Sequence, residues 1–146
     1  MSQEKLPLEL KLGLRTGSVF YFRARELTSA LPHFFVVLNQ NPLREKLLLL
    51  AVFTSQIDKV RLRNRERPHT VVEFGPQDYA PLDRLTAVDG NVILRRSLSE
   101  MVDLVRRKEM VYHVGLPASL LERLREAVLG SPVIDDEDKD RIRGGV

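Results

Sequence analysis

The sequence predicts an α+β domain that is mainly β, a small antiparallel barrel or sheet with one or two C-terminal helices. Three observations support this prediction. Short runs of aromatic and β-branched residues recur along the first two thirds of the chain, turn residues bound them, and helical patterns begin only near residue 97. The glycine-rich motifs GxGxxG and GxxxxGK[ST] are absent, so a doubly wound nucleotide-binding fold is not expected.

Composition favours one globular domain, because 43% of the 146 residues are hydrophobic and 29% are charged. The absence of cysteine excludes disulfides, thiolate metal sites and cysteine nucleophiles. No apolar run approaches the length of a membrane span, and the first residues do not resemble a secretory signal. We therefore expect a cytoplasmic protein with no membrane partner.

The chain divides into three expected parts. Residues 1–15 form an N-terminal arm or extra strand, because leucine recurs at every second position from Leu6 to Leu14. Residues 16–130 form the barrel domain with its C-terminal helices. Residues 131–146 are charged and glycine-rich at the end, which indicates a flexible tail.

Six strands are expected within the domain, at residues 19–22, 34–38, 47–53, 70–74, 85–88 and 92–94. The run 47–53 is apolar throughout, which fits either a strand buried on both faces or a short buried helix. We favour the strand because turn residues bound it closely. The last two strands flank the turn Asp89-Gly90-Asn91.

Two helices are expected after the strands. The first begins at Ser97, where Ser-Leu-Ser-Glu forms a capping box with Glu100. The second begins near Pro117, at a favoured first-turn position, and ends at Gly130. Its apolar stripe consists of Leu120, Leu121, Leu124 and Val128. This stripe predicts a helix packed on the core.

A basic run is the clearest charge feature, since the net charge of +3 is too small to imply polyanion binding by itself. Basic residues recur at every second position: Lys59, Arg61, Arg63, Arg65 and Arg67. If this stretch is extended, all five project from one face and suit a nucleic-acid phosphate backbone. A solvated hairpin loop, or an edge strand charged against sheet pairing, explains the alternation equally well.

Five short motifs follow one another in an order that is typical of a toxin family. They are Gly17-Ser18-Val19-Phe20, the segment 31–38 around Pro32, Val52-Phe53-Thr54-Ser55-Gln56-Ile57, Thr86-Ala87-Val88-Asp89, and Leu116-Pro117 before a leucine-rich helix. From about residue 16 to residue 129 the sequence resembles the MazF/PemK toxins, and the Thr-Ser-Gln match is the most specific. The resemblance implies that the barrel is SH3-like.

The resemblance also implies an activity. Members of this family are metal-independent endoribonucleases that use no cofactor, and the 2′-hydroxyl of the RNA attacks its own phosphodiester. They are dimers neutralised by an antitoxin. The expected partners are therefore single-stranded RNA, an antitoxin protein and a second copy of the chain.

Site residues follow from the matched motifs. Thr54 occupies the position of the threonine that binds the phosphate, although a threonine at a strand end also satisfies backbone groups. The family's arginine before the proline is replaced by Leu31, which can neither transfer a proton nor pair with developing charge. Arg23, Arg25 and His33 are the nearby candidates to replace it.

Asp89 occupies the position of the family's aspartate, where it would orient a catalytic arginine or contact a base, or it serves only to form the turn. Two alternative functions stay open. One is a noncatalytic SH3-like barrel that binds nucleic acid or protein through the basic run 59–67. The other is a toxin directed at DNA gyrase, like the related CcdB toxins, whose target contacts would correspond to residues 128–146.

Overall fold

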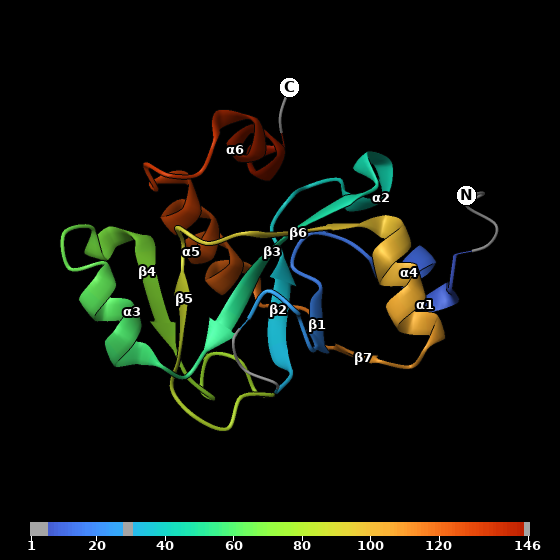
Figure 1. The fold of residues 1–146 in the computed structure, drawn as a ribbon, viewed down its shortest axis with the longest axis horizontal. Coiled ribbons are helices and arrows are strands. Elements are labelled where there is room, and N and C mark those ends of the chain that lie inside the picture. The colour runs from blue at the N-terminus through green and yellow to red at the C-terminus, as the bar shows by residue number, and fades with distance from the viewer. Residues whose placement is uncertain (1–5, 28–30, 145–146) are drawn as a thin grey trace.

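The computed structural model describes residues 6–27 and 31–144, which form one antiparallel sheet flanked by helices (Figure 1). The strands are β1 (Val19–Phe22), β2 (His33–Val37), β3 (Leu47–Thr54), β4 (Val71–Phe74), β5 (Thr86–Asp89), β6 (Leu94–Ser97) and β7 (Met110–His113). The helices are α1 (Leu8–Gly13), α2 (Pro42–Glu45), α3 (Ile57–Arg63), η2 (Pro68–Thr70), α4 (Leu98–Arg106), α5 (Ala118–Leu129) and α6 (Asp136–Arg143). The predicted α+β class with C-terminal helices is confirmed.

The seven strands that the described residues form have the order β4-β5-β3-β2-β1-β7, and β6 pairs with β3. Every pairing among them is antiparallel. The sheet is not closed, because β4 and β7 lie at its two ends and do not pair within the described part of the chain. The expected small barrel is thus an open, curved sheet.

Strand β3 is the centre of this sheet because it changes neighbours along its length. Its first half pairs with β6, from Leu47↔Ser97 to Leu50↔Leu94. Its last two residues pair with β5, at Phe53↔Val88 and Thr54↔Ala87. On its other side it pairs with β2. The sheet therefore divides at the end of β3, where β4 and β5 branch away (Figure 1).

Hydrophobic cores lie on both faces of the sheet. One core contains alternate β3 residues such as Leu48 and Leu50 and packs against α1 and α4 through Leu10 and Met101. The other contains the intervening residues and packs against α5 and α6. Because β3 contributes to both cores, its continuous apolar run is explained, and the predicted strand buried on both faces is confirmed.

The predicted helices are also confirmed. Ser97 caps α4: its Oγ accepts from the Glu100 backbone N–H at 3.1 Å, and Glu100 Oε1 accepts from the Ser97 N–H at 2.9 Å. Pro117 is the N-cap of α5, and the expected apolar stripe of that helix is buried. None of the described helices is long and apolar enough to cross a membrane.

The structure corrects the two ends of the chain. The arm was expected to be a strand, but Leu8–Gly13 form helix α1. A leucine at every second position also places leucines four residues apart, and residues four apart share one face of a helix. Leu10 and Leu14 are such a pair and are both buried, whereas Leu8 is 66% exposed. Residues 1–5 of the arm lie outside the described residues.

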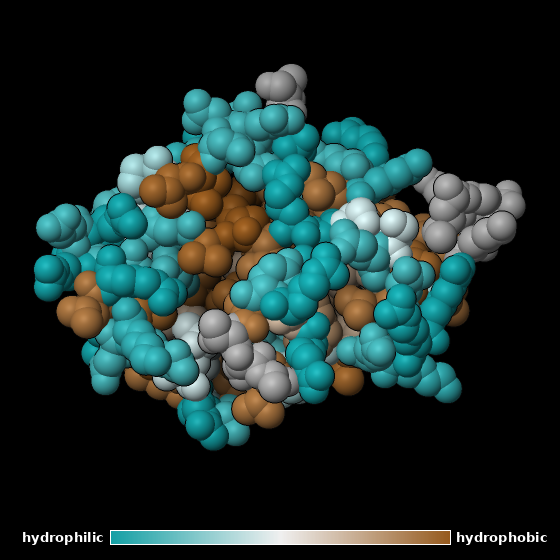
Figure 2. Space-filling view, in the orientation of Figure 1, coloured by the Kyte–Doolittle hydropathy of each residue, from teal (hydrophilic) through white to brown (hydrophobic). Residues whose placement is uncertain are grey.

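The C-terminal segment was expected to be a flexible tail, but Asp136–Arg143 form helix α6. Asp135 caps this helix by accepting from the Asp138 N–H at 2.9 Å, and Ile142 is fully buried. A charged helix with one buried apolar residue has a weak apolar pattern, which is why the sequence did not indicate it. Figure 2 shows polar residues covering α3 and α6, with hydrophobic residues gathered between them over α5.

Two smaller differences concern strands. The last predicted strand, 92–94, is shifted to Leu94–Ser97, because pairing with the start of β3 fixes its register. Strand β7 was not predicted. It forms by pairing with β1, from Phe22↔Met110 to Val19↔His113, and so depends on a neighbour that is distant in sequence.

Candidate functional site

Thr54 lies on a face of the sheet that also carries two carboxylates. Thr54 pairs with Ala87 of β5, and Ala87 pairs with Glu73 of β4. Directly opposed residues of antiparallel strands project to the same face, so Thr54 and Glu73 share a face about 10 Å apart. Asp89 is two residues from Ala87 along β5 and projects to this face as well.

Helix α3 is joined to this face by ion pairs with both carboxylates. Arg61 forms a bidentate pair with Glu73, with Nε to Oε2 at 2.6 Å and Nη2 to Oε1 at 2.5 Å. These hydrogen bonds from Arg61 hold the pKa of Glu73 below its usual value, and they raise the pKa of Arg61. The charge of Arg61 is therefore neutralised within the protein.

The second pair joins Arg63 to Asp89, with Arg63 Nε donating to Asp89 Oδ2 at 2.8 Å. The Asp89 side chain is only 5% exposed, whereas that of Arg63 is 55% exposed. Burial opposes ionisation of Asp89, but hydrogen bonds from the Asn91 backbone, Arg63 and Asn64 outweigh it and lower its pKa. Asp89 thus orients an arginine whose Nη groups have no protein partner among the described residues.

Asp89 also forms the predicted turn, because its Oδ1 accepts from the Asn91 backbone N–H at 2.9 Å. Both contacts that were considered for this residue, with an arginine and with the turn, are therefore present. Gly90 is required by close packing, since a Cβ there would lie 2.7 Å from the Thr70 carbonyl oxygen and 2.9 Å from the Ala127 carbonyl carbon. The carboxylate is consequently fixed in position.

A polar network behind Asp89 was not predicted. Asn91 Nδ2 donates to Asn64 Oδ1 at 3.0 Å and to Thr70 Oγ1 at 2.8 Å, and Ser131 Oγ donates to Asn91 Oδ1 at 2.6 Å. These residues come from the end of α3, from η2, from the turn after β5 and from the end of α5. No local signal could connect such distant segments. The network stabilises the base of α3.

The basic run does not form the extended stripe that its alternation suggested. Lys59, Arg61 and Arg63 belong to α3, in which Val60 and Asn64 are buried at helical spacing. Residues two apart on a helix point to different sides, so Arg61 turns to Glu73 while Lys59 and Arg63 share another side. The extended conformation, on which the arrangement of all five residues on one face depended, is therefore not present.

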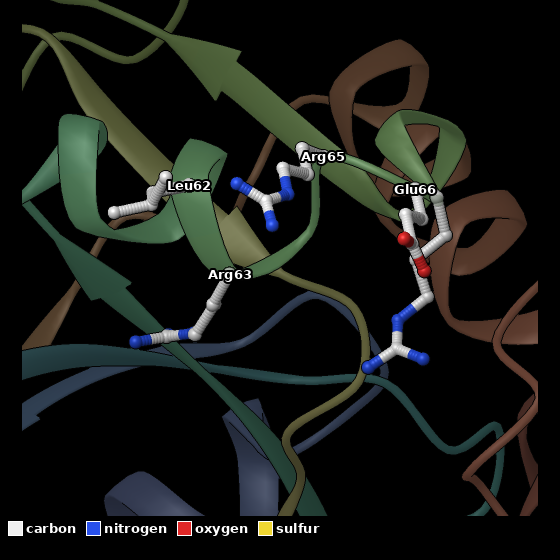
Figure 3. A pocket seen from close by; sticks show the side chains of 5 residues that line it. Leu62, Arg63, Arg65 and Glu66 are labelled. Atoms are coloured by element: carbon white, nitrogen blue, oxygen red, sulfur yellow. The ribbon is translucent and has the colours of Figure 1, made fainter.

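Three of the five basic residues nevertheless line one open hollow, of about 540 Å³. Its lining consists of Leu62, Arg63, Arg65, Glu66 and Arg67. Figure 3 shows Arg65 extending from the turn after α3 back toward Leu62 and Arg63, while Glu66 points in another direction. Arg67 Nε donates to Asn64 Oδ1 at 3.4 Å. Lys59 and Arg65 form no ion pair within residues 6–27 and 31–144.

His33 and Arg25 are placed differently with respect to Thr54. The β2–β3 ladder ends at Phe35↔Val52, before it reaches His33 and Thr54. His33 is two residues before Phe35 and Thr54 is two residues after Val52, so strand alternation turns both toward the same face. The His33 ring hydrogen-bonds through Nδ1 to the Leu31 carbonyl oxygen at 3.1 Å. His33 is therefore the histidine that the sheet brings to the Thr54 end of β3.

Arg25 is directed elsewhere. Its Nη2 lies 4.0 Å from Glu100 Oε2 at the start of α4. The next residue, Glu26, forms an ion pair with Arg96 of β6. Arg96 is opposite Leu48 of β3, which is six residues before Thr54, so this part of the chain lies near the other end of β3. The structure does not join Arg25 to Thr54. Leu31 is 69% exposed.

Thr54 itself accepts a hydrogen bond from the Gln56 backbone N–H through Oγ1 at 3.1 Å. The strand-end contact considered for it is therefore present, and the hydroxyl proton remains available to a ligand. In residues 6–27 and 31–144, no group of three or more His, Cys, Asp or Glu is arranged to hold a metal ion. The chain matches no family model and no curated protein significantly.

Proposed function

We propose that the protein binds single-stranded RNA at Thr54 and cleaves it without a metal ion, as do the MazF/PemK toxins that its sequence resembles. The observation that carries this proposal is the Arg63–Asp89 pair on the face of Thr54. A buried carboxylate fixes one side of the guanidinium and leaves its outer nitrogens toward solvent. This arrangement suits recognition of a phosphate.

The proposed reaction assigns one role to each group. The RNA 2′-hydroxyl attacks the adjacent phosphorus, the bond to the 5′-oxygen breaks, and a 2′,3′-cyclic phosphate and a 5′-hydroxyl result. Thr54 binds the phosphate, and Arg63 stabilises the negative charge that develops on its oxygens. His33, on the same face as Thr54, accepts the 2′-hydroxyl proton and then delivers it to the leaving 5′-oxygen. Arg63 thereby supplies the guanidinium that Leu31 lacks.

The proposal is tested by incubating the purified protein in EDTA with mixed-sequence single-stranded RNA. We expect cleavage that leaves cyclic-phosphate ends and falls at least about tenfold in Thr54→Ala and in Arg63→Ala. Arg44→Ala is the matched control, because Arg44 is an exposed arginine on α2 and should leave the rate unchanged. A well-folded protein that cleaves none of several RNAs would overturn the enzymatic proposal.

A second candidate is a noncatalytic module that binds RNA through the hollow beside α3. The exposed Leu31 favours it, because this side chain replaces the family's charged group with an inert one. This candidate predicts RNA binding without cleavage, weakened by Arg65→Ala and Arg67→Ala, both in the lining of the hollow, and falling steeply with salt. The same RNA in the same buffer distinguishes the two functions.

A further inference from the structure

An aromatic cluster lies on the face of the sheet opposite Thr54, near the edge strand β7. The register places Val111, Tyr21 and Phe34 in one row across β7, β1 and β2. The rings of Tyr21 and Phe34 stack at 4.7 Å between centroids, with 26° between their planes. His113 meets the Phe34 ring edge-on at 4.9 Å. Three rings from three adjacent strands thus form one surface.

One side of this cluster packs against buried residues, and the other side is accessible to solvent. Behind Phe34 lie the buried rings of Phe53 and Tyr79. The Tyr79 hydroxyl donates to the Val114 carbonyl oxygen, which ties the segment between β4 and β5 to the segment after β7. On the outer side, Tyr21, Phe34 and His113 are half-buried, and Val111 is 54% exposed. The rings therefore pack against one another and against buried rings while part of their surface stays accessible.

A positive charge stands beside the cluster. Phe20, Phe22 and Ala24 all lie in the core that contacts α1 and α4. Because side chains alternate along an extended chain, the side chain of Arg23 projects to the opposite face, the one that carries Tyr21. Arg23 is exposed and forms no ion pair with the described residues. Accessible aromatic rings next to a cation match the two parts of a nucleotide, its base and its phosphate.

We infer that Tyr21, Phe34 and His113 form a stacking platform for unpaired bases of single-stranded RNA, with Arg23 contacting the phosphate backbone. This inference rests on the proposed function. Phe34 is next to His33, and His33 begins β2 on the side of the sheet where the antiparallel strand β3 ends at Thr54. A single strand that passes over this end reaches both faces, whereas a stiff duplex does not. The platform binds bases outside the cleavage site.

The test uses a labelled 12-nucleotide RNA carrying 2′-O-methyl groups, so that binding is measured in EDTA without cleavage. Tyr21→Leu keeps an apolar side chain but removes the ring, and Tyr21→Phe keeps the ring. We expect Tyr21→Leu to weaken binding about 5- to 150-fold and Tyr21→Phe to retain it. Arg23→Ala should make the slope of the logarithm of the RNA binding constant against the logarithm of salt concentration shallower, by about the amount expected for one lost phosphate contact. Melting temperatures check that each variant is folded.

A second arm uses the same RNA with abasic sites in place of its bases. The wild type and Tyr21→Leu should bind this RNA equally, because the ring then has no base to stack on. If Tyr21→Leu binds the normal RNA as tightly as the wild type, the platform is wrong while the proposed function stands. If the wild type binds no RNA, both fail. If Tyr21→Leu alters only the oligomeric state in sedimentation, the cluster is an interface between copies of the chain and the inference is overturned.

Discussion

Helices α3 and α4 pack at opposite ends of the sheet, α3 on β4 and β5 and α4 on β6 and β7, and different forces hold them there (Figure 1). Helix α4 packs through Leu98, Met101 and Val102, which are buried in the core with α1. Helix α3 buries only Val60 within its own length and is held by pairs of its arginines with Glu73 and Asp89. The face under α4 is therefore sealed and apolar, while the face under α3 keeps charged groups near Thr54.

Under the proposed function, the α3 region is the one that binds the phosphate. Apolar contacts give stability that depends little on salt or on pH between about 5 and 8, whereas exposed ion pairs are screened by salt and lost when carboxylates are protonated. A region that must hold guanidinium groups ready for a phosphate needs the second kind of contact. The predictions below separate the two regions by these properties.

The largest effect is expected under α4. Met101→Ala removes a fully buried side chain and should lower the free energy of unfolding by about 3 kcal/mol, because it leaves a cavity. Urea denaturation measures this loss, which should be nearly the same in 0.05 M and 1 M NaCl. A strong dependence on salt would show that α4 is held by charge.

A smaller loss is expected at the base of α3. Asp89→Ala removes the buried partner of Arg63 and the acceptor of the Asn91 N–H, and should cost about 2 kcal/mol. Asp83→Ala is the control, since that carboxylate is exposed, and its effect should stay within about 0.5 kcal/mol. Equal losses from the two variants would contradict the role given to Asp89.

Acid should weaken the α3 region. The pKa values of Glu73 and Asp89 are lowered in the folded protein, so both groups stabilise it above their unfolded pKa values. That stability is lost as pH falls through the folded pKa values, which places the decline below about pH 4. Unfolding free energy measured from pH 7 to pH 2.5 should fall less steeply in Asp89→Asn. An unchanged slope in that variant would refute the assignment.

The smallest effect is expected for Arg61, whose pair with Glu73 lies at the surface. Arg61→Ala should lower the melting temperature less than Asp89→Ala does, and the difference from wild type should vanish in 1 M NaCl. Calorimetry at the two salt concentrations measures it. A loss that persists at high salt would mean that Arg61 acts by packing.

Much of the fold could be predicted because its signals are local. The runs 19–22 and 47–53 contain enough β-branched and apolar residues to define strands, and Ser97 with Glu100 defines the start of α4. Residues 6–14 were predicted to be a strand, and an extended conformation was one of the alternatives for 59–67. Alternation every two residues also contains the four-residue spacing of a helix, and helices form at Leu8–Gly13 and Ile57–Arg63. In both segments, packing against distant residues decided the outcome.

The candidate site was predicted only in part. Thr54 and Asp89 were identified by position in their motifs, and Arg63 was identified only as one member of a stripe. Its pairing with Asp89 depends on α3 folding back over β5, and the supporting contacts of Asn91 come from segments up to 40 residues away in sequence. Arg25 was proposed from proximity in the chain, but its loop is directed to Glu100.

The central claim is that Asp89 positions Arg63 to act on a phosphate at Thr54. A double-mutant cycle tests it most directly, with RNA cleavage rates in EDTA for the wild type, Asp89→Asn, Arg63→Ala and the double variant. If Asp89 acts through Arg63, Asp89→Asn slows cleavage and the double variant is no slower than Arg63→Ala alone. A folded Asp89→Asn variant with the wild-type rate, or losses that multiply in the double variant, would contradict the claim.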